Sequence, residues 1–355
     1  MVTHSTPSSV VLVSFALLAS ALPVTQPSHI VLISVDGLSG LALSSRLAGE
    51  AGERLPNLSR LVREGATTFE ARTDHANTDT LPNHTTMLVG RSVDDHRWTL
   101  NGTNPSRTLH GRNPDVPYLS SVFDVIHDHG LTTALRVQKC KFRVFDRSWN
   151  ANNGAPDVVG PDNGRDKIDR TACEPARVKD GQSALFSNLI QGLLEDPTHF
   201  TFVHYGELDE VGHESGWESP RWSKALEDLD RQLGKLLAAL DSHPSLAGRT
   251  VLLLTADHGG RLKGHSNNYQ RENYTIPFLV WGKGVARGAE LYALNEDTRA
   301  RPGRTRPDYA AKPQPIRNGD AANLVLSLLR LPAVPGSTIN ASQDLRVGPR
   351  HSGGQ

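Results

Sequence analysis

The chain has 355 residues, of which 21% are charged and 37% are hydrophobic, and its formal net charge is +0. This composition is typical of a globular protein, and the length allows one large core or at most two domains. Because the charge is balanced, the sequence has neither the basic footprint of a nucleic-acid-binding protein nor an acidic tail.

The first predicted element is an export signal. The apolar run VVLVSFALLASA covers residues 10–21 and ends in an A-x-A pattern that is typical of a cleavage site. This run is too short to span a membrane. The preceding residues contain no Lys or Arg, so a disordered apolar N-terminus is the alternative. We expect residues 1–27 to be a signal peptide and leader, cleaved near Ala21, and the mature protein to be exported without a membrane span.

Short apolar runs then alternate with amphipathic stretches. In chain order, the periodicity predicts a strand at 29–35, helices at 55–66 and 119–130, a strand at 132–138, a helix at 183–196, a strand at 199–205, a helix at 221–243, strands at 250–256 and 275–282, and a helix at 320–331. Strands that are apolar on both faces and separated by helices predict an α/β fold. We expect a mostly parallel central sheet with helices on both faces.

Two polar regions rich in Pro, Arg and Gly interrupt this alternation, near 101–180 and 286–316. We interpret them as surface insertions in a single domain over 28–345, followed by a flexible tail at 346–355. Long loops of this kind often border active sites. For the second region, a solvated insertion without a role is an equally good interpretation.

The chain has two cysteines, Cys140 and Cys173, on either side of a loop rich in Gly, Asn and Asp at 150–166. In an exported protein, two cysteines favour one disulfide, which could hold that loop in place. Two unrelated buried thiols are the alternative.

Acids and histidines follow the predicted strands. Parallel sheets bind ligands beyond the carboxyl ends of their strands, so the residues after each strand are candidates for a site. Three strands are followed by such residues, and a fourth supplier precedes the strand at 275–282: Asp36; Asp209 and His213; Asp257 and His258; and His265. Buried acids need compensation for their lost hydration, and a bound divalent metal provides it.

These six side chains predict a two-metal site. A mixed set of Asp and His without Cys suits Zn²⁺ and tolerates Mn²⁺. Six donors are too many for one catalytic tetrahedral ion, which needs an open position, but they suit two ions that share a substrate. Each motif alone could be a turn, namely the Asp-Gly pair at 36–37, DEVGH at 209–213 and DHGG at 257–260. Their joint occurrence at strand ends favours the metal site.

A two-metal site needs a nucleophile, and Thr80 in NTDTLPNHTTMLVG (77–90) is the candidate. Coordination to a metal ion would activate a hydroxyl that does not ionise unaided. Pro82 favours a helix start there, and helix N-termini attract anions such as a phosphoryl group. The alternative is that Thr80 only caps this helix.

Five motifs resemble the alkaline phosphatase superfamily, and in particular the type I phosphodiesterase/nucleotide pyrophosphatase family. They are VDGL at 35–38, TLPNH at 80–84, LDEVGH at 208–213, ADHGG at 256–260 and GHS…YTIPFLVWGKGV at 264–285. The resemblance runs from about residue 29 to 345, and the chain looks most like exported bacterial members of the family. It implies an alkaline phosphatase-like fold. It implies that Thr80 becomes transiently phosphorylated. It also implies two zinc sites, one with Asp36, Thr80, Asp257 and His258 and the other with Asp209, His213 and His265.

The resemblance also assigns a role to Asn101, which matches the family asparagine that donates a hydrogen bond to a phosphoryl oxygen. A neutral donor suits a diester, which carries less negative charge than a monoester. Without the resemblance, Asn101 would be interpreted as a turn residue before Gly102. Leu81 departs from the family, because nucleotide pyrophosphatases often have a phenylalanine there that lines the base pocket. No second base-stacking aromatic is identified, and the sulfatase signature Cys-x-Pro-x-Arg is absent.

The predicted function is therefore metal-dependent hydrolysis of a small-molecule phosphoester, either a phosphodiester or a nucleotide pyrophosphate, through a phosphothreonine at a two-zinc site. A phosphomonoesterase or phosphonate hydrolase on the same scaffold is one alternative. A non-catalytic binding protein stabilised by metal is another, and an intact set of six ligands with a hydroxyl nucleophile speaks against it. The sequence leaves the oligomeric state and the physiological substrate open.

Overall fold

The computed structural model describes residues 1, 27–102, 107–110, 117–175 and 184–349, so the predicted signal peptide at 2–26 lies outside the described residues. An eight-stranded sheet has the order β4-β3-β5-β1-β6-β7-β2-β8. Its strands are β1 (His29–Val35), β2 (Ala66–Arg72), β3 (Thr133–Val137), β4 (Arg170–Cys173), β5 (Phe200–Tyr205), β6 (Thr250–Thr255), β7 (Thr275–Gly282) and β8 (Ala289–Glu290). The strands from β4 to β6 pair in parallel, whereas β7 runs antiparallel to both β6 and β2. The predicted fold class is confirmed.

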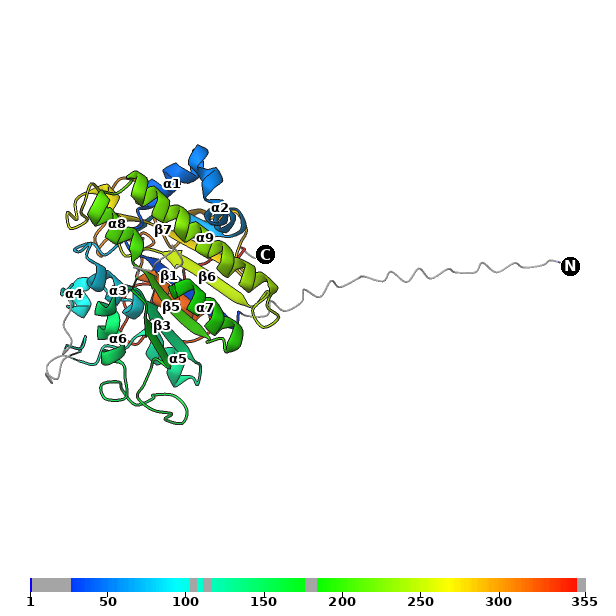
Figure 1. The fold of residues 1–355 in the computed structure, drawn as a ribbon. Coiled ribbons are helices and arrows are strands. Elements are labelled where there is room, and N and C mark those ends of the chain that lie inside the picture. The colour runs from blue at the N-terminus through cyan, green and yellow to red at the C-terminus, as the bar shows by residue number, and fades with distance from the viewer. Residues whose placement is uncertain (2–26, 103–106, 111–116, 176–183, 350–355) are drawn as a thin grey trace.

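Helices cover the sheet. The α-helices are α1 (Gly40–Ala48), α2 (Pro56–Glu64), α3 (Thr80–Val89), α4 (Val93–His96), α5 (Val122–Asp128), α6 (Arg143–Ser148), α7 (Ala184–Glu195), α8 (Glu207–Ser215), α9 (Pro220–Ser242), α10 (Arg271–Tyr274), α11 (Leu291–Leu294) and α12 (Asp320–Leu328), with short 3₁₀ turns η1 (Glu50–Arg54) and η2 (Cys140–Phe142). Helices α2, α7 and α8 pack against α9, and α7 and α9 lie in front of the sheet in Figure 1. Helices α3, α5 and α12 form a second packed group. Every residue of β1, β5 and β6 is buried, which requires cover on both faces.

The strongly periodic segments and the helix start at Thr80 were predicted well, whereas other elements, such as α1 and β2, were missed. Helix α9 lies within one residue of its predicted bounds, because Ser219 caps it by accepting a hydrogen bond from Trp222 N–H and Pro220 starts its first turn. Strand β2 was missed because its sequence, ATTFEAR, has no apolar run. It is held in the sheet by antiparallel pairing with β7, a contact between residues far apart in the chain.

The polar regions are partly built into the fold. The region at 286–316 contributes β8 and α11, and Tyr292 within it is buried. The expected tail from residue 346 differs from the structure over its first residues. Arg346 N–H donates to Asn295 Oδ1 at 2.7 Å, and the carbonyl of the buried Val347 accepts from Ala286 N–H at 2.8 Å.

Cys140 and Cys173 form a disulfide that joins η2 to the end of β4. The Gly-rich loop between them is held by a different contact. The Nζ atom of the buried Lys167 pairs with Asp157 and, at 2.9 Å, with Asp128, and it donates to the Gly164 carbonyl at 3.1 Å. This buried lysine ties the loop to the end of α5.

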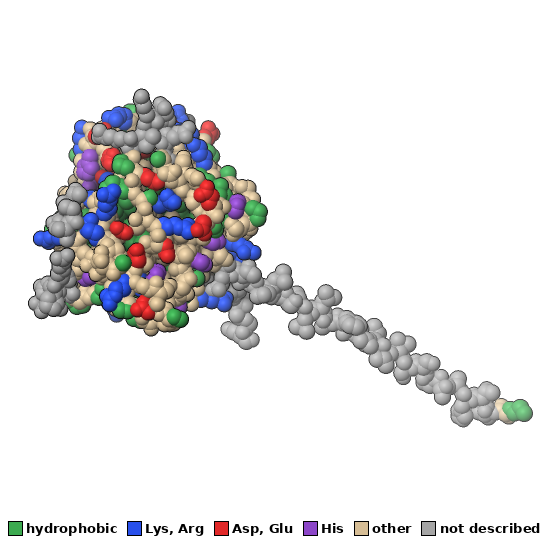
Figure 2. Space-filling view, turned by 60° about the horizontal axis from the view of Figure 1, so that its bottom comes forward, with side chains coloured by type: hydrophobic (Ala, Val, Ile, Leu, Met, Phe, Trp, Pro, Cys, Tyr) green, Lys and Arg blue, Asp and Glu red, His purple; other side chains and the backbone are tan. Residues whose placement is uncertain are grey.

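Surface and membrane properties agree with the composition. Figure 2 shows a face on which basic and acidic side chains are interspersed, without a large patch of one sign. Within the described residues, no helix has the length and apolar character that a membrane crossing requires.

A buried histidine lies where α3 and α4 pack together. Nδ1 of His96 accepts a hydrogen bond from Trp98 N–H at 3.0 Å, so Nε2 carries the proton and donates to Thr86 Oγ1 at 3.0 Å. Burial lowers the pKa of His96 from 6.5 to about 4. The ring therefore stays neutral in the folded protein at a pH where the unfolded chain is protonated.

This difference predicts a loss of stability in acid. As the pH falls from 6.5 to 4, the unfolded chain binds a proton at His96 that the folded protein does not bind. The free energy of unfolding should fall by about 3 kcal/mol from this residue alone. Urea denaturation in the presence of a chelator should show a steeper fall for the wild type than for His96→Gln. Parallel pH profiles for the two proteins would contradict the prediction.

Candidate active site

The polar ends of three neighbouring strands meet at one edge of the sheet. Strand β1 lies between β5 and β6, and the three run parallel, so their carboxyl ends point the same way. Asp36 follows β1, and Asp257 and His258 follow β6 closely. Asp209 lies in the first turn of α8, which starts directly after Gly206. The structure brings these predicted residues together, with Asp209 on a helix instead of a strand end.

Asp36, Asp257 and His258 form a first group, which we call group 1, with ligand atoms within 4.8 Å of one another. His258 Nε2 is 3.3 Å from Asp36 Oδ1 and 3.2 Å from Asp257 Oδ2. The Gly37 and His258 N–H groups donate to Asp257 Oδ1 at 3.2 and 2.9 Å, which leaves Oδ2 for the group. Gly37 has φ +77°, and a Cβ there would lie 3.1 Å from Asp209 Cβ, so the turn after β1 requires glycine.

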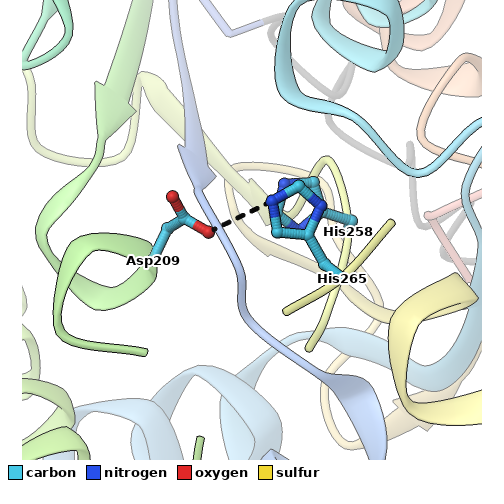
Figure 3. Close-up of side chains that lie close together, drawn as sticks. All are labelled: Asp209, His258 and His265. Atoms are coloured by element: carbon cyan, nitrogen blue, oxygen red, sulfur yellow. Dashed lines mark ion pairs between the residues drawn. The ribbon is translucent and has the colours of Figure 1, made fainter. Parts of the chain in front are cut away.

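Asp209, His258 and His265 form group 2 (Figure 3). His265 Nε2 is 3.8 Å from Asp209 Oδ1, and its ring stacks on that of His258 with centroids 3.7 Å apart. His213, one helical turn after Asp209, has Nε2 at 3.4 Å from Asp209 Oδ1, and its ring centroid is 5.0 Å from that of His265. The predicted residues Asp209, His213 and His265 are therefore neighbours, and His258 belongs to both groups. The side chain of His213 is 44% exposed, so the site is open to solvent on this side.

The protein orients all three histidines in the same way. Each places Nδ1 at hydrogen-bond distance from a backbone carbonyl oxygen: His213 from Lys263 (3.0 Å), His258 from Gly259 (2.7 Å) and His265 from Thr78 (2.8 Å). A carbonyl only accepts, so Nδ1 donates the proton, and Nε2 is the atom turned toward the acids. Burial lowers the pKa of His258, and burial together with the nearby His258 lowers the pKa of His265 to about 3. These two rings are neutral and can act as ligands.

The groups carry unpaired buried atoms and too little positive charge. Within the described part of the chain, four buried atoms of the groups have no hydrogen-bond partner: Asp36 Oδ1, Asp209 Oδ1, Asp257 Oδ2 and His258 Nε2. Each such atom costs about 1–3 kcal/mol. Among the described residues, the three carboxylates make two ion pairs with a lysine or arginine, and these are Asp36–Lys139 and Asp209–Lys139. Burial and the charges of Asp36 and Asp209 raise the pKa of Asp257 well above its usual value. Oxygen and nitrogen donors with this excess of negative charge fit divalent cations.

Lys139 joins the two groups and was missed by the sequence analysis. Its Nζ is 2.6 Å from Asp36 Oδ2 and 2.6 Å from Asp209 Oδ2. Burial opposes its charge, but the attraction of the two carboxylates is larger and raises the pKa of Lys139. Burial likewise opposes ionisation of Asp36, but Lys139 and His204 keep the pKa of Asp36 well below its usual range. Lys139 follows β3, so the strand-end rule that identified the acids could also have found it.

Thr80 is the first residue of α3, so it lies inside the helix and is not its cap. The chain around it is tied to both groups. Thr78 Oγ1 donates to the His265 carbonyl at 2.6 Å, and the Thr78 carbonyl accepts from the ring of His265. His84 Nδ1 lies 2.8 Å from the Thr80 carbonyl and 3.5 Å from Asp257 Oδ2. These contacts place the start of α3 beside the two groups.

Two further buried histidines, His204 and His84, lie next to the acids of group 1, and neither was predicted as a site residue. His204 Nε2 is 2.9 Å from Asp36 Oδ2, and His84 Nε2 is 2.8 Å from Ser34 Oγ. The ring of Phe142 packs on both, with centroids 4.1 Å from His204 and 4.6 Å from His84. His84 belongs to the TLPNH motif, which was a signal, whereas His204 lies inside β5 and looks like a core residue in the sequence.

Asn101 lies next to the start of α3. Its Oδ1 accepts hydrogen bonds from Leu81 N–H at 3.0 Å and from Lys141 Nζ at 2.9 Å. The side chain of Leu81 is buried in the hydrophobic core, so it does not present a surface to a ligand. Leu81 therefore offers no apolar contact to a nucleotide base, in contrast to the phenylalanine that nucleotide pyrophosphatases often have at this position.

A third set of acids and histidine, His127, Asp128 and Asp157, also has ligand atoms within 4.8 Å. Lys167 Nζ already pairs with both of these acids. The protein supplies its own cation there, so the donor set does not call for a metal.

Comparison with known proteins identifies relatives. A model of the family "Type I phosphodiesterase / nucleotide pyrophosphatase" matches residues 30–262. A phosphopentomutase from Pectobacterium carotovorum is 33% identical over 89 residues, which cover 25% of this chain and 19% of that protein. The matched segment is thus less than a fifth of the length of this relative.

Solved structures share the fold. Murine ectonucleotide pyrophosphatase/phosphodiesterase 5, as an inactive variant in complex with AMP, superposes with a TM-score of 0.59 at 14% identity, covering 90% of this chain and 100% of that one. A protein of the alkaline phosphatase superfamily from Vibrio parahaemolyticus has a TM-score of 0.52 at 15% identity, with 86% and 67% covered. The fold is therefore alkaline phosphatase-like, as the motifs predict.

Proposed function

Because the chain belongs to the type I phosphodiesterase/nucleotide pyrophosphatase family, we propose that it hydrolyses phosphoesters at the site formed by groups 1 and 2. The observation that carries this proposal is the convergence of Asp36, Asp209 and Asp257, with unpaired buried oxygens, beside the start of the helix that begins with Thr80. Phosphodiesters or nucleotide pyrophosphates are the proposed substrates. Small-molecule substrates suit a protein whose net charge gives no basic footprint for nucleic acid.

Two divalent cations, proposed to be Zn²⁺, would be held by the residues of the two groups. Asp36, Asp257 and His258, together with the Thr80 hydroxyl, would hold one, and Asp209, His213 and His265 would hold the other. The four unpaired buried atoms and the neutral Nε2 atoms of His258 and His265 support this assignment. When bound, such ions lower the pKa of a coordinated hydroxyl or water and neutralise charge on phosphoryl oxygens.

Thr80 is the proposed nucleophile. Its Oγ attacks phosphorus in line with the leaving oxygen, so the P–Oγ bond forms as the bond to the leaving group breaks. The hydroxyl proton of Thr80 is lost, and the leaving oxygen takes up a proton. Water then attacks the phosphothreonine, the P–Oγ bond breaks and Thr80 regains its proton. Because α3 starts at Thr80, the positive end of its helix dipole favours the phosphoryl oxygens.

Asn101 is proposed to bind a non-bridging phosphoryl oxygen through its Nδ2 amine. Its Oδ1 is occupied by Leu81 N–H and Lys141, so the amine is the part left to donate.

The Cys140–Cys173 disulfide supports a further proposal, namely that the protein works outside the cytosol after export.

A comparison of two chromogenic substrates tests the proposed function. We expect kcat/KM for bis-p-nitrophenyl phosphate to exceed that for p-nitrophenyl phosphate by about 10-fold or more on zinc-loaded protein, because a neutral amide favours a singly charged diester. Steady-state kinetics with both substrates at one pH and ionic strength measures the ratio. A strong preference for the monoester would instead support a phosphomonoesterase. Hydrolysis of a phosphonate and of neither phosphate ester would support a phosphonate hydrolase.

A further inference from the structure

Lys141 makes two contacts with Asn101. Its Nζ is 2.9 Å from Asn101 Oδ1 and 3.3 Å from the Asn101 carbonyl oxygen. Leu81 N–H is 3.0 Å from the same Oδ1. Both donors can only donate, so they require the oxygen of the amide on their side and turn the Nδ2 amine to the other side. Without Lys141, the Leu81 N–H would be the one remaining donor of this pair that favours one orientation of the Asn101 amide over the other.

The segment that carries Lys141 is held at three points. Lys139, two residues earlier, is paired with Asp36 and Asp209. Cys140 is joined to Cys173 at the end of β4. Phe142 is fully buried against His84 and His204. Lys141 therefore starts from a fixed backbone and reaches Asn101, which lies in a polar region before residue 103 without a helix or strand of its own.

The positive charge of Lys141 affects the hydrogen bonds of the Asn101 amide. A hydrogen bond from an ammonium to the amide oxygen is stronger than one between neutral groups. It also draws electron density from the amide, which makes the Nδ2 protons better donors, as in other chains of hydrogen bonds. Lys141 acts through Asn101 in this arrangement.

From these contacts we propose that Lys141 is a positioning residue for the reaction, which holds Asn101 with its amine directed at a phosphoryl oxygen. The inference rests on the proposed function, because it assigns Asn101 to the phosphoryl group. It adds a specific dependence: Lys141 matters only as long as Asn101 is present. A lysine that merely stabilised the fold would not depend on Asn101 in this way.

A double-mutant cycle tests the dependence. We expect Asn101→Ala to lower kcat on bis-p-nitrophenyl phosphate by about 10²-fold, in the range seen when one donor to a developing charge is removed. Lys141→Met should lower kcat by about 10-fold with little change in KM, and Lys141→Arg, which keeps a charged donor, should retain most of the activity. In the Asn101→Ala background, Lys141→Met should change kcat by less than about 2-fold. Equal losses in both backgrounds would overturn the proposal.

Lys224→Met is the matched control, because Lys224 is a 59% exposed lysine whose ion pair is with Asp228 on the surface of α9. It should behave like the wild type, and all variants should keep the zinc content and thermal midpoint of the wild type. A fall in the midpoint for Lys141→Met that matches its loss of activity would overturn the positioning role.

Binding of inorganic phosphate by calorimetry separates this inference from the proposed function. Lys141→Met should weaken phosphate binding to the zinc-loaded protein several-fold when Asn101 is present and not when it is alanine. If the wild type turned over no phosphoester but showed this coupling, the proposed function would fail and the positioning role would stand. If the wild type hydrolysed phosphoesters but neither measurement showed the coupling, the proposed function would stand and the positioning role of Lys141 would fail.

Discussion

Thr80→Ala is expected to lower kcat for phosphoester hydrolysis by about 10³-fold or more, because it removes the oxygen that we propose attacks phosphorus. Thr80 is buried at the first position of α3, and alanine keeps its Cβ, introduces no larger group and is a good helix former. The variant should therefore fold. The other proposed zinc ligands lie outside α3 and should keep both metal ions bound. Kinetics on the diester, with zinc measured by mass spectrometry, tests both expectations.

Two variants separate the chemistry from the packing. Thr80→Ser keeps a hydroxyl and should retain at least about a tenth of the activity. Thr85→Ala, on the same helix, removes a buried hydroxyl that donates to the Leu81 carbonyl at 2.8 Å, and it should affect stability more than turnover. Hydrolysis by pure Thr80→Ala at the wild-type rate would refute the nucleophile assignment. A zinc-loaded wild type without activity on any ester would instead support a non-catalytic binding protein.

Asp257→Asn is expected to have opposite effects on the metal-free and the zinc-loaded protein. In the absence of metal, three buried carboxylates face one lysine, and burial and the charges of Asp36 and Asp209 disfavour ionisation of Asp257. Neutralising this residue should raise the thermal midpoint of the chelated protein by about 1 °C or more, since about 1 kcal/mol of repulsion is removed. In zinc, the variant should bind one ion fewer and lose about 10³-fold in activity.

The matched control is Asp74→Asn, which also removes a buried carboxylate charge. The Oδ2 atom of Asp74 accepts from Val93 N–H at 2.9 Å and from the Tyr309 hydroxyl at 2.7 Å, and the Oδ1 atom accepts from Ala76 N–H at 2.7 Å. An asparagine Nδ2 amine cannot accept hydrogen bonds, so this variant should lose some of them and lower the midpoint with and without zinc. Unchanged zinc stoichiometry in Asp257→Asn would contradict the assignment of Asp257 as a ligand.

The acids of the site were predictable because they follow apolar strands. A buried strand such as β1 has a continuous apolar run, and parallel strands end at the same edge, so Asp36 and Asp257 were expected to meet. Lys139 follows the strand at 132–138, so the same rule points to this lysine as well. His204 could not be found in this way, because a histidine inside a strand has the same appearance as a core residue.

By itself, the sequence determined which residue types lie at the strand ends, that the strands are buried, and that the motifs occur in the family's order. These features depend on neighbours in the chain, so local periodicity reveals them. Only the tertiary structure decided that β3 lies beside β5, which brings Lys139 between Asp36 and Asp209, and that Lys141 reaches Asn101. Strand order is set by packing between segments far apart in the chain, and the hydrogen bonds of a side chain depend on that packing. The two lysines beside Cys140 therefore acquire their partners only when the sheet is assembled.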